Sequence, residues 1–341
     1  MEKFLASIKI PALDEKARQA VRRRWSKLSQ YERGLGKLED MAASIGAMTG
    51  REPRILKKAM ILTAGDHGIA RYGVSNFPQE VTVQMIKGYL RYAAGANVLA
   101  RHAGIRNQDL FVVDIGVNAD LLPHPQLINK KVAYGTADFT KGPAMTDEQA
   151  FLSLKAGFDV ASKCIDAGYE MLVLSEMGIG NTTASAAIAS VFTGLPPERT
   201  VGRGTGIGDR RMAIKRQVVE EALRVNKPQK GEPLKVLAKV GGYELGGLAG
   251  VLIAGAARRA PVFIDGLNAT AAALIAHGLF PAARGYMLAS HLSAEIAHKA
   301  MLDILRLEPV LTAGMRLGEG TGAAVVVSLL DAAIAVLNKA A

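Results

Sequence analysis

Six short runs of apolar, β-favouring residues recur along the chain, and each opens into small or polar residues. They read KAMILTA, DLFVVD, YEMLVLS, LKVLAKV, APVFID and RGYMLAS, at residues 58–64, 109–114, 169–175, 234–240, 260–265 and 284–290. Continuous apolar runs of this length are typical of strands buried on both faces, and the intervals between them leave room for crossover helices. The pattern therefore predicts an α/β fold with a mostly parallel six-stranded sheet flanked by helices.

The intervening segments carry helix signals. We expect helices at 79–103, 147–166, 181–192, 209–224, 244–257, 293–305 and 322–337, with Asn181 and Ser293 as N-cap residues. No strand pattern occurs in residues 1–50 or beyond about residue 306. This organisation predicts a large α/β catalytic domain at 55–305, and a small helical subdomain formed by 1–54 and 306–341 together.

Charge is concentrated near the N-terminus of the 341-residue chain. The net charge is +11, and residues 1–59 hold 14 Lys and Arg against 7 acidic residues. Their spacing in ARQAVRRRWSKLSQYERG is that of an amphipathic helix with a solvated basic face. Because only 5% of residues are aromatic, stacking platforms for single-stranded nucleic acid are scarce. We expect no nucleic-acid partner, and instead a general attraction for anionic small molecules.

Other bulk features favour the cytoplasm. The single cysteine, Cys164, excludes an internal disulfide framework and a multi-cysteine zinc site. The first residues lack the apolar core of a secretory signal. The apolar segment 323–338 contains Asp331 and is expected to be a helix buried in the protein, so we expect no membrane span.

Small and polar residues follow every predicted strand. The loops read GDHG, IGV, EMGIGNTT, GGYE, GLN and HLS in chain order. Ligands of open α/β sheets lie at the carboxyl ends of the strands, so these loops should converge on one rim. That rim is the predicted active site.

Two of the glycine-rich stretches suit a phosphate. SEMGIGNTTAS, at residues 175–185, places Gly178 and Gly180 before a helix start, where free N–H groups and the helix dipole favour an anion. GRGTGIGDRRMAIKRQ, at 202–217, adds Arg203 and Lys215. Read alone, this second stretch fits a flexible loop before a charged helix equally well.

RLGEGTGAA, at residues 316–324, resembles a phosphate cradle but contains a carboxylate, Glu319, which would repel a phosphate. The same letters match a dinucleotide fingerprint, yet only one helix follows, and that motif needs a βαβ unit. The six histidines show no metal-binding spacing, so structural hydrogen bonding is the favoured interpretation of Asp66 and His67 in AGDHG. By spacing alone, Phe77 and its neighbours in GVSNFPQEVTVQM fit ordinary core packing better than a wall for a flat ring.

Taken together, the loops resemble the nicotinate-nucleotide:dimethylbenzimidazole phosphoribosyltransferase (CobT) family. The matching stretches run in order from residue 64 to 324 and read AGDHGIARYGVSNFPQEVT, VVDIGV, EMGIGNTT, GRGTGIGD, GGYELGGLAG, FIDG, SHLSAE and RLGEGTGAA. The chain departs from the expected family pattern at Leu292 and Ile296. The resemblance implies a Rossmann-like sheet, a small helical domain built from both termini, a homodimer, and no metal or cofactor.

The implied reaction transfers the 5-phosphoribosyl group of nicotinate mononucleotide to 5,6-dimethylbenzimidazole or a related base, with inversion at C1′. Small molecules are thus the expected partners. By resemblance, Glu319 would accept a proton from the attacking ring, and Glu176 would place negative charge near the ribosyl centre. The residues expected to hold the phosphoribosyl unit are Gly178, Gly180, Asn181, Thr182, Arg203, Gly204, Thr205, Gly206, Lys215, Ser290 and Arg316. Those expected to line the base pocket are Phe77, Gln84, Met85, Met177 and Leu317.

Several alternatives stay open at the level of sequence. The acceptor could be adenine or a phenol, because the base pocket is the part of such an enzyme most open to change. A nucleotide-binding protein without catalysis and a nicotinamide-cofactor oxidoreductase are less favoured. A binding protein has no need of Glu176 and Glu319 together in ligand loops, and the dinucleotide fingerprint is misplaced for the oxidoreductase.

Overall fold

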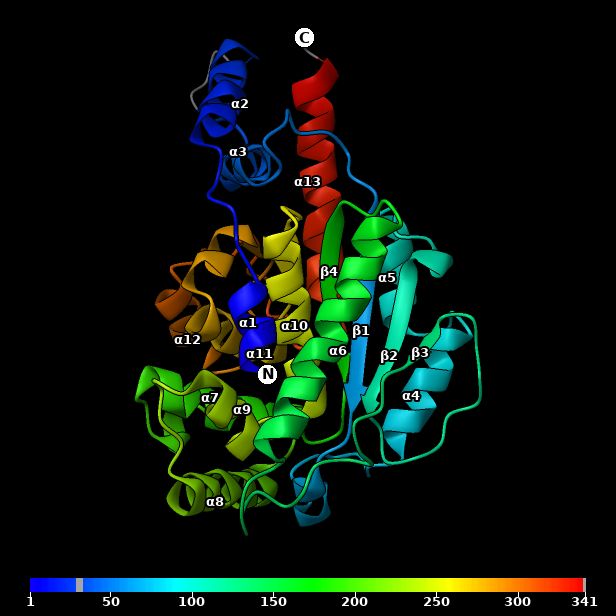
Figure 1. The fold of residues 1–341 in the computed structure, drawn as a ribbon, viewed down its shortest axis with the longest axis vertical. Coiled ribbons are helices and arrows are strands. Elements are labelled where there is room, and N and C mark those ends of the chain that lie inside the picture. The colour runs from blue at the N-terminus through cyan, green and yellow to red at the C-terminus, as the bar shows by residue number, and fades with distance from the viewer. Residues whose placement is uncertain (29–32, 340–341) are drawn as a thin grey trace.

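A computed structural model describes residues 1–28 and 33–339 and contains one six-stranded sheet (Figure 1). The strands are β1 (Lys58–Gly65), β2 (Leu110–Gly116), β3 (Leu127–Asn129), β4 (Met171–Met177), β5 (Val262–Ile264) and β6 (Met287–Ala289). Their order is β3-β2-β1-β4-β5-β6, and every neighbouring pair is parallel. The predicted α/β fold with a parallel sheet is confirmed.

Helices surround the sheet. They are α1 (Glu2–Ser7), α2 (Glu15–Leu28), α3 (Lys37–Thr49), α4 (Val81–Leu90), α5 (Gly95–His102), α6 (Asp147–Asp166), α7 (Asn181–Thr193), α8 (Asp209–Asn226), α9 (Pro233–Val240), α10 (Tyr243–Ala257), α11 (Leu267–Leu279), α12 (His298–Leu305) and α13 (Thr321–Lys339). In Figure 1, α6 crosses in front of the central strands and α13 runs behind β4. Because helices cover both faces, every residue of β1 and β4 is buried, which explains their unbroken apolar runs.

One predicted strand is wrong. LKVLAKV forms helix α9, which starts at Pro233, a residue whose fixed φ suits the first helical turn. Its buried residues Val236, Leu237 and Val240 share one helical face, while Lys235 and Lys239 are spaced one turn apart. A seven-residue apolar run fits both the two-residue period of a strand and the roughly 3.6-residue period of a helix, so the sequence did not distinguish the two. The sixth strand is β3 at the sheet edge, which has two half-buried residues and one exposed residue and shows no apolar run.

Three helix boundaries also differ from the prediction. The segment 79–103 divides into α4 and α5, because Tyr92 adopts a left-handed conformation with φ of 61° between them. Gly180, not Asn181, is the N-cap of α7. Helix α12 begins at His298, and the backbone N–H of Ser293 donates to the Nδ1 atom of that histidine instead of capping a helix.

Helices α6 and α10 pack unusually closely on one face of the sheet. Thr146 begins α6 with a capping box, since its hydroxyl accepts from Gln149 N while the Gln149 side chain accepts from Thr146 N. At the crossing, a Cβ added to Gly157 would lie 1.9 Å from the Gly247 carbonyl oxygen. Only glycine permits this approach, which brings α10 directly against the central strands.

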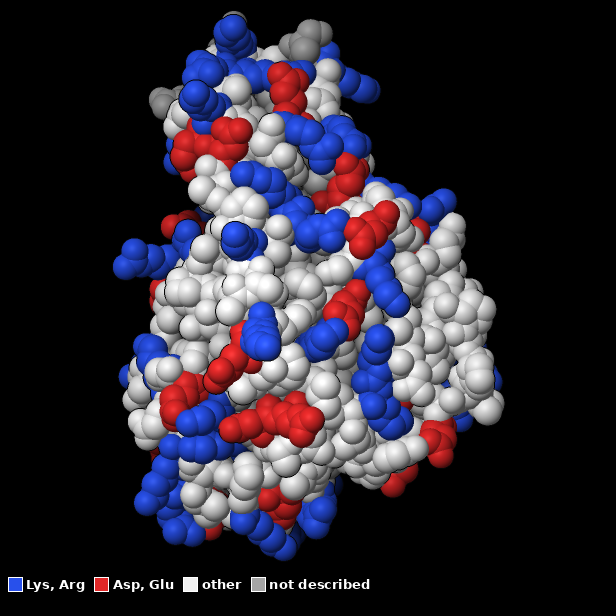
Figure 2. All heavy atoms as spheres, viewed as in Figure 1, with Lys and Arg blue, Asp and Glu red and all other residues white. Residues whose placement is uncertain are grey.

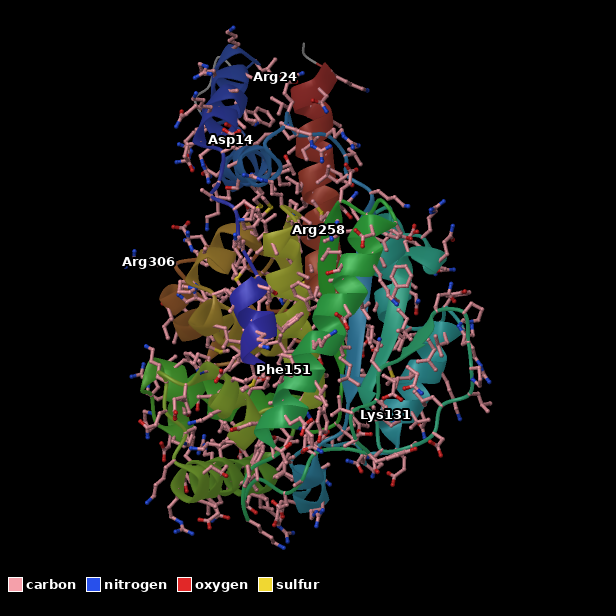
Figure 3. All side chains as sticks on the ribbon, in the orientation of Figure 1. Asp14, Arg24, Lys131, Phe151, Arg258 and Arg306 are labelled. Carbon is pink, nitrogen blue, oxygen red and sulfur yellow. The ribbon has the colours of Figure 1, made fainter. Side chains whose placement is uncertain are left out.

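Helices from near the two ends of the chain meet at one end of the molecule. Helices α2 and α3 and the C-terminal half of α13 project together above the sheet (Figure 1). Asp14 caps α2 through Ala17 N, and Val21 and Trp25 are its buried residues (Figure 3). By contrast, α1 lies on α6, where Phe4 contacts Phe151 edge to face (Figure 3). The division into a large domain and a small helical subdomain stays a prediction.

The expected amphipathic basic helix is α2. Lys and Arg gather over this upper part of the molecule (Figure 2). Arg18 pairs with Glu15 and Arg24 with Glu52 at the surface, as expected for a solvated face. Within residues 1–28 and 33–339, α13 is the one helix long and apolar enough to cross a membrane, and 56% of its apolar window is buried inside the protein.

Candidate active site

The carboxyl ends of the strands surround a cavity of about 530 Å³. Its walls come from the loops after β4, β5 and β6, from residues near α4, and from the segment before α13. These loops converge because all the strands run in the same direction. The cavity lies where the sequence predicted the active site.

Most of the predicted site residues line this cavity. They are Glu176, Glu319, Gly178, Gly180, Asn181, Thr182, Gly204, Thr205, Arg316, Phe77, Met85, Met177 and Leu317. Arg203, Gly206, Lys215, Ser290 and Gln84 are not among its lining residues. The roles of both groups stay predictions.

The residues outside the lining have identifiable surroundings. Arg203 donates to the Ile207 carbonyl and pairs with Asp209, so it braces its own loop. Ser290 is buried and donates to the Ile264 carbonyl, between the ends of β5 and β6. Gln84 is exposed on α4. The contacts of Arg203 and Ser290 favour supporting positions over direct ligand contact.

Lys215 lies directly beneath one end of the cavity. Its Nζ atom donates to Thr182 Oγ1 at 2.8 Å and to the Gly202 carbonyl at 3.0 Å. A Cβ added to Gly204 would lie 3.2 Å from this Nζ, so the glycine keeps the ammonium within reach of a ligand. Burial lowers the pKa of Lys215 to about 8, against the opposing effect of Glu295. A positive charge, a glycine loop and the N-terminus of α7 together suit a phosphate.

Glu295 lies at the same end. Its Oε1 atom accepts from Gly204 N at 2.9 Å, and in the described part of the chain its buried Oε2 has no hydrogen-bond partner. The Gly204 N–H that would bind a phosphate is thus occupied by a carboxylate in this structure.

Glu176 lies near the end of β4 and lines the same cavity. Its pKa is raised to about 7, mainly by burial and also by the charges of Asp265, Glu244 and Glu319, while hydrogen bonding from Asn268 opposes them. The side-chain amide of Asn181 donates to its Oε2 atom. A carboxylate with this pKa is only partly ionised near neutral pH. A nearby cation would therefore favour its charged form.

Glu319 occupies a strained turn immediately before α13. Gly318, Glu319 and Gly320 have consecutive φ values of 77°, 61° and 76°. Such a conformation is uncommon for a residue with a side chain and is found often at functional sites. The backbone N–H of Glu319 approaches Glu176 Oε1 at 3.5 Å. The two predicted catalytic residues are therefore adjacent, although 143 positions separate them in the chain.

Tyr89 of α4 lies beside Glu319. Burial raises the pKa of Glu319, the nearby Tyr89 hydroxyl lowers it, and the charge of Asp265 raises it. The Tyr89 hydroxyl is buried and has no partner at hydrogen-bonding geometry among residues 1–28 and 33–339, so a small movement of the Glu319 side chain would satisfy it. This arrangement makes Glu319 a stronger proton acceptor than an exposed carboxylate.

Asp66 and His67 support the cavity from behind. Asp66 accepts from Thr82 Oγ1 at 2.6 Å, and Thr82 in turn accepts from Ile179 N in the loop after β4. His67 Nε2 lies 2.8 Å from Glu244 Oε1, and both side chains are fully buried. Burial disfavours protonation of His67, but Glu244 raises its pKa overall. The expected structural hydrogen bonding of AGDHG is confirmed.

The loop carrying Phe77 is tied to the glycine loop. Thr205 Oγ1 accepts from Asn76 N at 2.9 Å and lies 3.2 Å from Ser75 Oγ. Arg211 of α8 donates to the Ser75 carbonyl and to Asn76 Oδ1. Thr205 thus joins two cavity walls as well as lining the cavity.

Sequence reasoning gave no role in the site to five polar wall residues that follow β5 and β6. They are Asp265, Asn268, His291, Ser293 and Glu295. They lie in or beside GLN and HLS, which follow predicted strands and were expected at the rim. Position relative to the strands was the available signal, because these stretches lack the glycine density of the other loops. No group of three or more His, Cys, Asp or Glu within the described residues is arranged to hold a metal ion.

Comparison with known proteins gives consistent matches along the chain. A family model described as phosphoribosyltransferase matches residues 10–341. The nicotinate-nucleotide–dimethylbenzimidazole phosphoribosyltransferase of Chloroflexus aggregans is 50% identical over 333 residues, which cover 97% of this chain and 94% of the relative. The enzyme of the same name from Geobacter sulfurreducens is 47% identical over 308 residues, covering 90% and 87%.

A crystal structure agrees with these matches. That of the nicotinate-nucleotide–dimethylbenzimidazole phosphoribosyltransferase from Thermus thermophilus superposes with a TM-score of 0.89 at 41% identity, covering 96% of each chain. Sequence similarity, the six-stranded parallel sheet and the order of the cavity loops lead to one conclusion. The chain belongs to the nicotinate-nucleotide–dimethylbenzimidazole phosphoribosyltransferase family of enzymes.

Proposed function

We propose that the protein transfers the 5-phosphoribosyl group from nicotinate mononucleotide to 5,6-dimethylbenzimidazole or a related lower-ligand base. The products are α-ribazole 5′-phosphate and nicotinate, in the assembly of the cobalamin nucleotide loop. The names of the relatives support this reaction. The observation that carries it is one cavity lined by Glu176 and Glu319, with the Lys215 ammonium bonded to its lining residue Thr182.

The nucleotide binds first through its phosphate in this proposal. Lys215, Gly204 and the start of α7 hold the phosphate, because they combine a cation with backbone N–H donors. The phosphate replaces the Glu295 carboxylate at Gly204 N. The ribose then extends toward Glu176, and Arg316 lies at the same cavity wall.

Glu176 stabilises charge in the transition state. As the bond between C1′ and the pyridinium nitrogen breaks, its electron pair goes to nicotinate, and positive charge develops on the ribosyl carbon. The Glu176 carboxylate is buried and lines the cavity, where low dielectric strengthens its attraction for that charge. The Asn181 amide fixes the carboxylate in place.

Glu319 acts as the general base. One nitrogen of the benzimidazole attacks C1′ from the face opposite to the departing nicotinate, and the other nitrogen loses its proton to Glu319. The raised pKa of Glu319 brings its basicity closer to that of the ring nitrogen. Phe77, Met85, Met177 and Leu317 supply apolar surface for the flat acceptor.

The assay that tests the reaction gives purified protein nicotinate mononucleotide and dimethylbenzimidazole in the presence of a chelator. We expect equal amounts of nicotinate and α-ribazole phosphate, measured by mass spectrometry. A mixture of dimethylbenzimidazole, other benzimidazoles, adenine and phenols in one reaction would identify the preferred acceptor. The absence of product with every acceptor would refute the proposed function.

We also propose a homodimer in the cytoplasm, with no membrane or nucleic-acid partner and no metal or cofactor. Phe77 and Leu317 are 51% and 62% exposed at the cavity, which supports coverage of this apolar rim by a second copy. We propose too that α2, α3 and the end of α13 form the small subdomain. Light scattering of the purified protein would measure the dimer, and a monomeric mass at all concentrations would refute it.

A further inference from the structure

Asp265 holds the turn that carries Glu319. It follows β5 and is 3% exposed at the cavity wall. Its Oδ1 atom accepts from Ala323 N at 2.9 Å, and its Oδ2 atom accepts from Gly320 N at 3.2 Å. Both carboxylate oxygens are thus bonded to backbone groups immediately after Glu319.

This contact replaces the usual local cap of a helix. Ser, Thr, Asp or Asn commonly caps the first turn with its own side chain, but the residue before α13 is Gly320. The cap is instead supplied by Asp265, which is 55 positions away in the chain. The start of α13 is therefore located relative to β5 and the cavity rather than by its own sequence.

The strained turn needs such an external anchor. Glu319 lies between two glycines in a run of three left-handed residues, which L-amino acids do not maintain by local preference. Thr321 bonds back to the Gly318 carbonyl through both its N–H and its hydroxyl. These local bonds close the turn, whereas Asp265 fixes where the turn lies relative to Glu176.

We propose that Asp265 is a positioning residue, whose two backbone hydrogen bonds hold the Glu319 carboxylate in its reactive place. This inference rests on the proposed function, because it concerns the geometry of the general base. A misplacement of about 1 Å in such a group can lower turnover about 100-fold.

The charge of Asp265 supplies a second measurable effect. Burial raises the pKa of Glu176 and of Glu319, and in both cases the Asp265 charge raises it further. Other charged or titratable groups also face this cluster. They are Tyr89 of α4, Glu244 of α10, His67 after β1 and His291 after β6, whose Nδ1 lies 4.0 Å from Asp265 Oδ1. Arg316 lies on the same segment as Glu319.

The test compares Asp265→Asn with the unmodified protein. Asparagine has nearly the same size but keeps only one acceptor oxygen and carries no charge. We expect kcat to fall about 10- to 100-fold with little change in KM for nicotinate mononucleotide. The acid limb of the plot of kcat against pH should move to lower pH, because removing the Asp265 charge lowers the pKa of both Glu176 and Glu319. A merely structural change would not produce that shift.

Two further variants make the outcome decisive. Asp265→Glu keeps the charge and both oxygens, so the acid limb of its kcat–pH profile should stay in place. This measurement remains a test even if Asp265→Asn folds poorly. In a Glu319→Gln background, Asp265→Asn should have little additional effect on kcat, because the positioned carboxylate is already absent. Asp303→Asn, at an exposed ion pair of α12, is the matched control.

The possible failures are distinguishable. If the unmodified protein does not turn over, the proposed function fails and this inference fails with it. If it turns over and Asp265→Asn keeps its kcat and acid limb, only the positioning role is refuted. Full additivity of the two substitutions would also refute it, since Asp265 would then act independently of Glu319.

Discussion

The buried ammonium of Lys215 makes nucleotide binding depend on pH in a specific direction. Burial lowers its pKa from 10.5 to about 8, so the group is charged below pH 8 and neutral above it. The substrate phosphate is a dianion throughout this range, since its second pKa is about 6. We therefore expect the affinity for nicotinate mononucleotide to fall as the pH rises through about 8. Lys215→Met should lower the affinity at pH 7 and remove this dependence.

The magnitude follows from the contacts of Lys215. Its Nζ atom has two protein acceptors, which leaves one donor for the phosphate within the described part of the chain. Hydrogen bonds to charged groups contribute about 1.5–3 kcal/mol. Loss of this contact should therefore raise Kd about 10- to 150-fold.

The same pKa predicts a change in stability. The unfolded chain binds a proton at Lys215 up to pH 10.5, whereas the folded protein releases it near 8. The free energy of unfolding should therefore gain a contribution as the pH rises from about 8 to 10.5. The difference of about 2.5 pKa units corresponds to about 3 kcal/mol. Lys215→Met should lack this gain.

Calorimetric titration with nicotinate mononucleotide from pH 6.5 to 9.5 measures the affinity, and denaturant unfolding over the same range and above it measures the stability. Lys163→Met is the matched control, because Lys163 is exposed on α6. An unchanged Kd in Lys215→Met would remove Lys215 from the phosphate site. A Kd of the unmodified protein that does not change through pH 8 would contradict the buried charge.

Three other changes test the site and the fold. Glu319→Gln should lower kcat about 100- to 10,000-fold while leaving nucleotide affinity nearly unchanged, and an unaltered single-turnover rate would exclude a general base there. In the unmodified protein kcat/KM should rise as the pH passes about 7, where Glu176 ionises. Glu176→Gln should lose most activity and also this rise of kcat/KM with pH. A rise that persists in the variant would belong to another group. Gly157→Ala should lower the free energy of unfolding by about 1–3 kcal/mol, because its Cβ would collide with Gly247. The control Gly88→Ala in α4 has open space around the added Cβ and should not destabilise the fold. Equal unfolding midpoints for the two variants would contradict the close packing of α6 and α10.

The sequence predicted the parts of the fold that depend on local pattern. Apolar runs at β1, β2 and β4 are long enough to identify buried strands, and the predicted bounds of α6 agree with the structure, in which Thr146 and Gln149 form its cap. The same reasoning misassigned α9, whose seven residues are too short to separate a strand period from a helical one. It also omitted β3, which forms only because β2 offers it an edge.

The candidate site shows the same division between local and distant information. The sequence by itself determined that glycine-rich and polar loops follow the strands, and that Glu319 is out of place in a phosphate loop. Only the tertiary structure brought Glu319 beside Glu176, placed Lys215 beneath Gly204, and made Asp265 the cap of α13. These contacts join residues far apart in the chain, and a hydrogen bond or a shifted pKa depends on distance and burial in space. Periodicity along the chain carries no information about either, so it could not predict these contacts.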